Sequence, residues 1–463
     1  MPANGSVTPS AASRQLPLGE ALIPPSPLSL VTLLEEAGHL AYAVGGCVRD
    51  ALLGQTPGDW DLCTSAQPAQ VMACLRAYGL RVLETGLQHG TVTAIIDRKP
   101  IEITTFRLDG GYTDHRRPDS VTFTDDLAED LSRRDFTVNA MAWHPMKGLI
   151  DPFNGESDLR AGLLRCVGEP ARRFGEDALR ILRCLRFASV LGFDIEENTS
   201  QALFDLKNTL QHIAAERIQG ELTKLLCGRN PRKILLDYHE VIFAVLPQLR
   251  PLSGFDQRTP WHCHDIWGHT CAAVEAAPPS PILRWAALLH DCGKPPCFFM
   301  RDGTGHFHGH PAVSERLARE ILGGLKCPKK LIERVAILIR HHELRLLEQP
   351  PKSAKLRRLL GELGPETLLD LLDLTRADVT AQAPEKRYRL EGYDAMRRQI
   401  LALAEENPCV TRGQLAINGK DLMELGLQGP ALGRMLDCLL EEVLEGRVEN
   451  KRESLIQCAM RNV

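Results

Sequence analysis

The sequence places a glycine turn close to a pair of carboxylates. Gly45 and Gly46 precede Arg49 in a turn between a predicted strand and a predicted helix, and Asp59 and Asp61 follow shortly after. Side chains two positions apart on a strand point the same way, so the two aspartates can present their carboxylates to one point. Carboxylate pairs suit Mg²⁺, which bridges them to substrate phosphates, and glycines let backbone N–H groups approach a triphosphate. An ordinary turn and a solvated acidic loop are the alternatives to this nucleotide chemistry.

Two further segments carry polar groups that can complete such a site. Glu102 lies between two isoleucines on a predicted strand, where it is either a third carboxylate or a surface charge at a sheet edge. Downstream, the guanidinium of Arg134 offers forked donors to phosphate or ribose. Its neighbours Asp135 and Asn139 offer further hydrogen bonds. We expect all four side chains to lie beside the carboxylate pair.

A later helical segment adds a carboxylate and a guanidinium that share a face. Asp177 and Arg180 are three positions apart on a helix predicted over 177–191. They are either a pair that recognises a base edge or an ordinary salt bridge within the helix.

Taken in order, these segments resemble the motifs of the bacterial class II tRNA nucleotidyltransferases. That family comprises the CCA-adding enzymes and their relatives the bacterial poly(A) polymerases, built on a DNA polymerase beta-like head. The matching segments are Gly45 to Asp50, Asp59 with Asp61, Arg133 to Ala140, Glu176-Asp177 with Arg180, and Glu216-Arg217-Ile218. Five motifs in the family's order make the resemblance specific, and it continues weakly to the C-terminus.

The resemblance implies a role for each matching residue. Asp59 and Asp61 would hold the catalytic Mg²⁺, with Glu102 as the third member of the predicted catalytic set. The predicted nucleotide-binding residues are Gly45, Gly46 and Arg49 at the triphosphate, Arg134 and Asp135 at the sugar, Asn139 in the same motif, and Asp177 and Arg180 at the base edge. A carboxylate accepts from an exocyclic amine and a guanidinium donates to ring acceptors, so the last pair can act as a protein template.

The implied activity is addition of CMP, CMP and AMP, from CTP and ATP, to the 3′ end of tRNA. In such a transfer the RNA 3′-hydroxyl attacks the α-phosphate in line, and the protein supplies positioning and neutralising charge rather than covalent chemistry. Addition of A alone and poly(A) synthesis share Asp177 and Arg180, so they stay open as alternatives. A third alternative is a metal phosphohydrolase whose transferase head is vestigial.

A second group of residues, rich in histidine, suits a different metal. Histidine and aspartate recur across a predicted all-helical segment, and together they suit a divalent ion. The run from Leu288 to Lys294 resembles the HD phosphohydrolase superfamily. The ligand set that this resemblance implies is His269, His290, Asp291 and Asp378, extended to two metals by His310 and one of His341 or His342. Neighbours on a helix diverge by about 100°, so we expect only one of the last pair to ligate; His341 is included in the predicted set, and the choice between the two stays open.

The identity of this second metal stays open. A complete ligand set suggests a secondary phosphohydrolase activity, on phosphate or cyclic phosphate at damaged RNA ends. We interpret His306 and His308, which flank the set, as surface or core histidines.

The elements that must position these residues make an α+β chain. Apolar periodicity predicts helices over 28–37, 47–53 and 68–78, strands over 41–44 and 60–63, and a hairpin of strands 91–96 and 101–106. Beyond residue 151 strand signals almost vanish, and helical spacing recurs over 216–226, 281–289 and 312–322. With the resemblance, the predicted fold is a small polymerase beta-like head with a mixed sheet, followed by a mostly all-α neck, an HD domain and a tail.

The predicted division of the chain has five parts. They are a disordered tail over 1–26, a nucleotidyltransferase head over 27–156, a helical neck for base and RNA binding over 157–228, an HD-type domain over 229–385, and a helical tRNA-binding tail over 386–463.

Composition limits the protein class. The chain has 463 residues, 44% hydrophobic and 25% charged, which is typical of a globular protein of several domains. The net charge of −4 confines any RNA surface to a local patch, for which the arginines from Arg160 to Arg186 are candidates. Scattered cysteines and the lack of a membrane-length apolar run favour a cytoplasmic protein. The sequence does not indicate an oligomeric state.

Overall fold

The computed structural model describes residues 23–84, 86–111, 120–259, 261, 263–344, 346–347, 353–406 and 410–462. Contacts divide the chain into two compact units, Met1–Val245 and Leu246–Val463. Most of the predicted tail, residues 1–22, lies outside the described residues, and the first helix begins at Pro25. Within the described part of the chain, no helix combines the length and the apolar character needed to cross a membrane.

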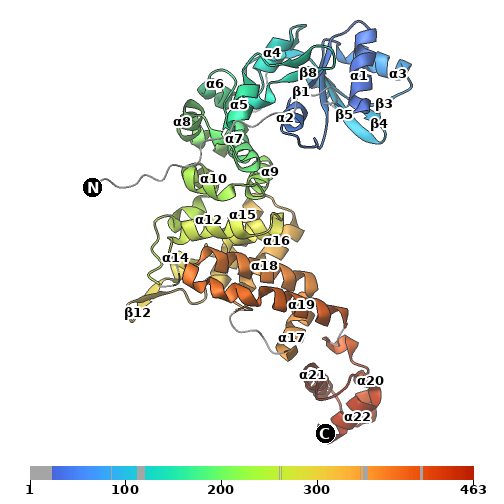
Figure 1. Cartoon of the computed structure of the whole chain (residues 1–463). Helices are drawn as coiled ribbons and strands as arrows, with labels where there is room; N and C mark the ends of the chain where they lie inside the picture. The colour runs from blue at the N-terminus through green and yellow to red at the C-terminus, as the bar shows by residue number, and fades with distance from the viewer. Residues whose placement is uncertain are drawn as a thin grey trace. The chain divides into compact units, whose positions relative to one another are not determined.

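The first unit is built on a seven-stranded mixed sheet in the order β3-β4-β5-β2-β1-β8-β9. Its strands are β1 (Ala41–Val44), β2 (Asp61–Thr64), β3 (Arg81–Leu83), β4 (Thr91–Ile96), β5 (Lys99–Thr105), β8 (Ala142–His144) and β9 (Gly148–Ile150). β2 and β5 run parallel, and the other neighbours run antiparallel. Helices α1 (Pro25–Glu36) and α3 (Pro68–Ala77) pack on each other and on this sheet (Figure 1).

The predicted hairpin is confirmed and sets the register of the sheet. β4 and β5 join through Asp97 and Arg98, whose φ angles are 51° and 64°. Positive φ angles at both turn residues are required in a two-residue hairpin turn whose twist matches that of the strands. Along β5, Ile101 and Ile103 are buried whereas Glu102 is exposed on the opposite face. Because β2 and β5 are aligned in parallel, Glu102 lies directly across from Asp61.

Smaller elements and helices complete the first unit. They are α2 (Gly46–Leu52), β6 (Arg107–Asp109), β7 (Val121–Phe123), α4 (Leu127–Ser132), α5 (Gly155–Ala161), β10 (Leu163–Leu164), α6 (Pro170–Glu176), α7 (Leu179–Leu191), β11 (Asp194–Ile195), α8 (Glu197–Leu206), α9 (Ala215–Leu226), α10 (Pro231–Asp237) and α11 (His239–Val245). The mostly helical character predicted beyond residue 151 is confirmed, and helices α7 and α9 pack against each other.

The single helix predicted over 177–191 is wrong at its start. Asp177 has extended backbone angles, φ −139° and ψ 104°, and separates α6 from α7. Its carboxylate accepts a hydrogen bond from the backbone N–H of Leu179 at 3.0 Å. Aspartate competes for backbone donors in this way at helix starts, which explains the break.

The second unit is a helical bundle with a short hairpin. Its elements are α12 (Ile266–Ala276), α13 (Pro281–Leu289), α14 (Lys294–Cys297), β12 (Phe299–Arg301), β13 (Thr304–His306), α15 (His310–Gly324), α16 (Lys329–His341), α17 (Ser353–Leu363), α18 (Pro365–Ala381), the 3₁₀ segment η5 (Pro384–Gly392), α19 (Tyr393–Glu405), α20 (Gly419–Glu424), α21 (Pro430–Leu444) and α22 (Arg452–Asn462). α12 packs on α13 and α18, and α16 packs on α13, α15 and α18. The helices predicted over 281–289 and 312–322 are found within α13 and α15.

The end of the chain has a core of its own. Leu422, Leu439 and Leu455, one from each of α20, α21 and α22, are fully buried together. Gly426 and Gly429 have φ angles of 89° and 54° and interrupt the helices. The division into five parts is finer than the two units and stays a prediction.

Candidate active site and metal centre

A cavity of about 470 Å³ in the first unit gathers the predicted nucleotide-binding residues. Its lining includes Gly45, Gly46, Arg49, Arg134, Asp135, Asn139, Asp177 and Arg180, together with Asp61. These residues come from the β1–α2 turn, the start of β2, the segment after α4, and the break before α7. The fold therefore brings together side chains that are far apart in the sequence.

The glycine turn lets the chain come close to Arg134. Gly45 has φ 85°, a conformation that L side chains rarely adopt. A Cβ atom added there would lie 2.9 Å from Nη1 of Arg134, closer than real Cβ contacts allow. Gly46 begins α2, and Arg49 on that helix donates to the side-chain oxygen of Asn139. The positive φ at Gly45 therefore favours glycine, and a side chain there would also displace the Arg134 guanidinium.

Carboxylates border this cavity at the start of β2. Asp61 lines it, and Glu102 lines a smaller adjoining cavity of about 200 Å³ that also includes Asp61. Burial, then the charges of Asp59 and Glu102, raise the pKa of Asp61 to about 6. A cation relieves the repulsion that these neighbouring charges exert on Asp61, and oxygen ligands suit Mg²⁺. The donor set therefore fits the metal implied by the sequence.

The carboxylate of Asp135 is held from several sides. Oδ2 accepts two hydrogen bonds from Arg183, at 2.9 and 2.6 Å, and Oδ1 accepts one from the amide of Asn139 at 3.1 Å. Burial opposes ionisation, but Arg183 and Asn139 hold the pKa of Asp135 well below its usual range. Arg183 is not among the predicted nucleotide-binding residues, although its spacing from Arg180 on α7 places both on one face.

Asp177 and Arg180 both line the cavity, yet neither pairs with the other. Asp177 accepts a hydrogen bond from Arg217 of α9 at 3.0 Å. Arg180 donates to Glu176 at 2.7 Å and to the backbone carbonyls of Arg173 and Arg133. The alternative of a salt bridge between Asp177 and Arg180 is therefore wrong, and each side chain is positioned by a partner of its own.

A phenylalanine that the sequence analysis missed also lines the cavity. The guanidinium of Arg186 lies 3.9 Å from the centre of the Phe187 ring, and those of Arg49 and Arg183 lie at 5.1 and 5.5 Å. Arg186 is in turn 2.7 Å from Glu221 of α9. Stacked guanidinium groups around one ring keep several positive charges at the cavity wall. Phe187 belongs to a helically spaced apolar pattern, which does not distinguish a cavity wall from a core position.

The arginines of the predicted basic neck are paired. Their carboxylate partners are Glu156 for Arg160, Asp158 and Glu196 for Arg165, Glu176 for Arg172, Arg173 and Arg180, Asp135 for Arg183, and Glu221 for Arg186. Pairing neutralises much of the patch, so these arginines serve the nucleotide cavity and the packing of the neck as well as any RNA.

The second unit holds a buried cluster of imidazoles and carboxylates. Nε2 of His269 lies 2.9 Å from Oδ1 of Asp378, and Nε2 of His290 lies 3.2 Å from Oδ2 of Asp291. Oδ1 of Asp291 lies 3.2 Å from Nε2 of His310. Asp291 therefore belongs to two groups of potential ligands, one with His269 and His290 and one with His310 and His342, and could bridge two ions.

Backbone carbonyls orient the imidazoles in this cluster. The Nδ1 atoms of His290, His310 and His342 face the carbonyl oxygens of Ala287, Phe307 and Ile339 at 2.8, 3.0 and 2.6 Å. A carbonyl only accepts, so each Nδ1 carries the proton and donates, which is the usual support of a metal-binding histidine.

The Nε2 atoms of His310 and His342 face each other at a distance that a cation between them would stabilise. Their Nε2 atoms lie 3.0 Å apart, and two unprotonated nitrogens at this distance repel. A proton or a metal ion removes that repulsion. The donor set therefore fits a divalent metal, in agreement with the chemistry expected of histidine and aspartate ligands.

Of the two candidates His341 and His342, the structure places His342 in the cluster. The structure brings His342 to the cluster, where it is 7% exposed, and leaves His341 outside it. Both residues end α16, and successive positions on a helix diverge by about 100°, so the register of α16 against α13 and α15 decides which one faces inward.

Charge and burial are balanced within the cluster. Burial opposes ionisation of Asp291, but His290 and Lys294 hold its pKa well below the usual range. Burial lowers the pKa of His290, but Asp291 and Asp378 raise it to about 10. Burial, then the charges of His290 and His310, lowers the pKa of His342 to about 3. A metal ion would replace the proton on His290 when it binds.

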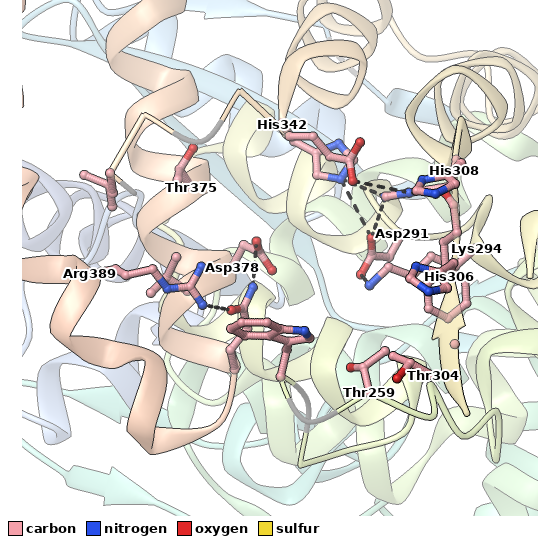
Figure 2. A pocket seen from close by; sticks show the side chains of 18 residues that line it. Thr259, Asp291, Lys294, Thr304, His306, His308, His342, Thr375, Asp378 and Arg389 are labelled. Carbon is pink, nitrogen blue, oxygen red and sulfur yellow. Dashed lines mark hydrogen bonds and ion pairs between the residues drawn. The ribbon is translucent and has the colours of Figure 1, made fainter. Parts of the chain in front are cut away.

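A cavity of about 440 Å³ opens onto this cluster. Figure 2 shows Asp291, His342 and Lys294 gathered at one end of the cavity and Arg389 at the other. Nζ of Lys294 lies 2.7 Å from Oδ2 of Asp291. His306 and His308, interpreted from the sequence as surface or core residues, line the cavity. A ligand can therefore reach the metal ligands through it.

Models of known families match three parts of the chain. Residues 41–165 match the poly A polymerase head domain, residues 192–251 match the RNA and SrmB-binding site of polymerase A, and residues 310–459 match tRNA nucleotidyltransferase domain 2.

Whole-chain relatives extend this similarity. The CCA-adding enzyme of Geobacillus stearothermophilus is 36% identical over 431 residues, covering 92% of this chain and 94% of the relative. The CCA-adding enzyme of Anoxybacillus flavithermus is also 36% identical, and the match covers 94% of this chain and 96% of that relative. The crystal structure of the Bacillus stearothermophilus CCA-adding enzyme in complex with CTP has a TM-score of 0.70 at 30% identity, covering 94% of this chain and 96% of that one. The predicted fold class, a polymerase beta-like head followed by a helical region, is confirmed.

Proposed function

The chain is a nucleotidyltransferase of the class II CCA-adding enzyme and poly(A) polymerase family, and from that premise we propose that it adds CMP, CMP and AMP to the 3′ end of tRNA. The observation that carries the proposal is the single cavity lined by the glycine turn, Asp61, and the Asp177 and Arg180 side chains. Relatives solved with CTP and with ATP support CTP and ATP as the nucleotides.

The residues of the cavity divide the work of the transfer. A divalent cation held by Asp59 and Asp61, with Glu102 alongside, would neutralise charge on the phosphates. The glycine turn and Arg49 bind the triphosphate, and Arg134 and Asp135 bind the sugar, the latter fixed by Arg183. Positioning and electrostatic stabilisation are the main needs of phosphoryl transfer.

The base-recognition pair is fixed before a nucleotide arrives. Arg217 and the backbone N–H of Leu179 hold the two oxygens of Asp177. Glu176 and two backbone carbonyls hold the terminal nitrogens of Arg180. Each carboxylate oxygen keeps a second lone pair and the guanidinium keeps further N–H groups, and these can meet a base edge. A pre-positioned acceptor and donor suit both C and A, because each base presents an amine beside a ring acceptor. This shared pattern is also why addition of A alone and poly(A) synthesis stay as alternatives.

One experiment separates these activities. Purified protein is incubated with tRNA transcripts that end before CCA, after C, and after CC, with CTP, ATP or both, and the products are sequenced. CCA addition predicts C, C and A on the first transcript and nothing beyond the final A. Extension of the CC transcript alone would instead assign the A-adding reaction, and long A tails would assign a poly(A) polymerase.

The orientation of the histidine cluster supports a second candidate activity, a metal-dependent phosphohydrolase. The Nε2 atoms of His290, His310 and His342 converge on the Asp291 carboxylate, beside a cavity that also contains Lys294. A divalent metal there would activate water, and Lys294 would hold a phosphate oxygen. Hydrolysis of a 2′,3′-cyclic phosphate by metal-loaded protein, with each of Mn²⁺, Ni²⁺ and Zn²⁺, tests this activity. A metal phosphohydrolase with a vestigial head is disfavoured because the head retains Asp59, Asp61 and Glu102.

A further inference from the structure

Trp261 lines the cavity that opens onto the histidine cluster, and it is 45% exposed. An aromatic ring that lines a cavity and stays this exposed contributes little to a core and presents a flat surface to that cavity. Nothing in the metal chemistry itself requires an indole there. The ring is therefore available to contact whatever enters.

Trp261 is nevertheless held in place. Nζ of Lys386 lies 3.7 Å from the centre of its ring, a cation–π contact that covers one face. Its backbone carbonyl accepts a hydrogen bond from the N–H of Ala383 at 3.0 Å. Both partners lie at or beside η5, so the ring has a fixed support and need not be ordered when a ligand binds.

The segment η5 is also connected to the predicted metal ligand Asp378 through hydrogen bonds. Arg389 of η5 donates to the side-chain oxygen of Gln382, and the amide of Gln382 donates to Oδ2 of Asp378 at 3.2 Å. Asp378 then faces His269 through its other oxygen. One short segment therefore positions both the aromatic ring and one of the metal ligands.

The cavity has more room and more charge than a metal and one phosphate need. Its volume of about 440 Å³ is that of a small-molecule site. Lys294, beside Asp291, supplies positive charge for a phosphate at the metal ligands, Arg389 adds positive charge at the other end of the cavity, and Trp261 supplies a flat aromatic surface. A ligand that uses all of these features carries a phosphate and a planar heterocycle.

We propose that Trp261, supported by Lys386, is the base-stacking residue that makes the histidine site select phosphates carrying a nucleobase over phosphates that lack one. The proposal rests on the phosphohydrolase activity proposed above and specifies what that site recognises. Trp261 does not touch the reacting atoms, so it sets KM rather than kcat.

Paired substrates test this selection in metal-loaded, full-length protein. Adenosine 2′-monophosphate carries a base, and glycerol 2-phosphate is a secondary phosphate ester without one. Trp261→Ala should raise KM for the adenosine ester about 5- to 150-fold, the range of one lost stacking contact, with kcat unchanged. Both constants for glycerol 2-phosphate should stay as in the wild type. Trp261→Phe, which keeps a ring, should restore most of the affinity.

A matched control and a longer substrate sharpen the test. Tyr388 is 63% exposed on η5 and is absent from the described lining of the cavity, so Tyr388→Ala should change neither substrate. Hydrolysis of an RNA ending in a 2′-phosphate, compared with that of adenosine 2′-monophosphate, shows whether the site accepts a nucleotide at an RNA end or only a free nucleotide. An equal rise in KM for both esters, or no change for either, overturns the proposal.

A binding measurement separates this proposal from the phosphohydrolase itself. Adenosine 2′-monophosphate is titrated against wild type and Trp261→Phe, and quenching of tryptophan fluorescence is measured. The difference between the two proteins is the Trp261 signal, since Trp60, beside the head aspartates, can also be quenched by a nucleotide. If wild type hydrolyses neither ester but the Trp261 signal is quenched, the phosphohydrolase proposal fails and the stacking role stands. If glycerol 2-phosphate is hydrolysed and no Trp261 quenching occurs, the stacking proposal fails alone. Absence of both signals overturns both.

Discussion

The two candidate metal sites of this chain differ in how complete they are before any ligand binds. In the head, Asp59 and Glu102 are exposed and Asp61 is half-buried. In the second unit, His269, His290 and Asp291 are at most 2% exposed, and their ligand atoms lie within 4.8 Å of one another. The head therefore presents an open set of carboxylates, and the second unit a closed set of mixed ligands.

The difference follows from the elements that carry the ligands. Carboxylates at the start of one strand and across from it on the next point toward solvent, where a cation shared with substrate phosphates completes the site. Imidazoles on packed helices are locked by carbonyls at their Nδ1 atoms. A site that binds its metal with the substrate can stay open, whereas a resident metal needs its ligands prepared.

The largest expected effect is in the open site. Asp61→Asn should lower nucleotide addition by at least about 10³-fold, because it removes a charged ligand of the catalytic cation. Stability should not fall, since the pKa of Asp61 is already raised by burial, Asp59 and Glu102. Incorporation kinetics and thermal unfolding measure the two quantities. Activity near the wild-type rate would show that Asp61 is not a metal ligand, and the head would then have no open metal site to compare with the histidine cluster.

The closed site should respond independently. Replacing both His290 and Asp291 by Ala should abolish metal binding by the second unit and any hydrolysis of a cyclic phosphate. Nucleotide addition should stay within about threefold of wild type, because the described residues that line the nucleotide cavity all belong to the first unit. Metal content by atomic spectroscopy and incorporation into tRNA are measured on the same preparation. Complete loss of addition by a folded double variant would make the histidine cluster part of the transfer reaction.

A smaller effect is expected at the base-recognition pair. Arg180→Ala should reduce discrimination between correct and incorrect nucleotides by about 1–3 kcal/mol, the size of one good base contact. The ratio of kcat/KM for CTP and ATP to that for GTP and UTP measures it. Equal weakening of all four nucleotides would instead assign Arg180 to the phosphates.

The smallest effect should come from the support of that arginine. Glu176→Gln keeps a hydrogen-bond acceptor beside Arg180 but removes its charge, so selectivity should fall only about two- to threefold. Arg172→Ala, at an exposed partner of the same glutamate, is the matched control and should leave selectivity unchanged. Loss as large as that of Arg180→Ala would show that Glu176 itself contacts the nucleotide.

Much of the fold could be predicted where a pattern is local. The strand at 41–44, the hairpin at 91–106 and the helix at 281–289 each follow from the periodicity of a few neighbouring residues. The helix predicted over 177–191 failed at its start for a local reason too, because the carboxylate of Asp177 caps the backbone of Leu179. Periodicity reports which face is apolar and does not report such a side-chain bond.

By itself the sequence determined which chemical groups are present and in what order: the glycine turn, the carboxylate pair, the arginine-rich segments, and the histidines with Asp291 and Asp378. Only the tertiary structure decided their partners. It paired Asp177 with Arg217, 40 positions away, and it turned His342 rather than His341 toward Asp291. It also made Phe187 and Trp261 cavity walls. The physical reason is that residue type and local spacing set the direction of a side chain on its own element, whereas the group it meets depends on how that element packs against distant ones.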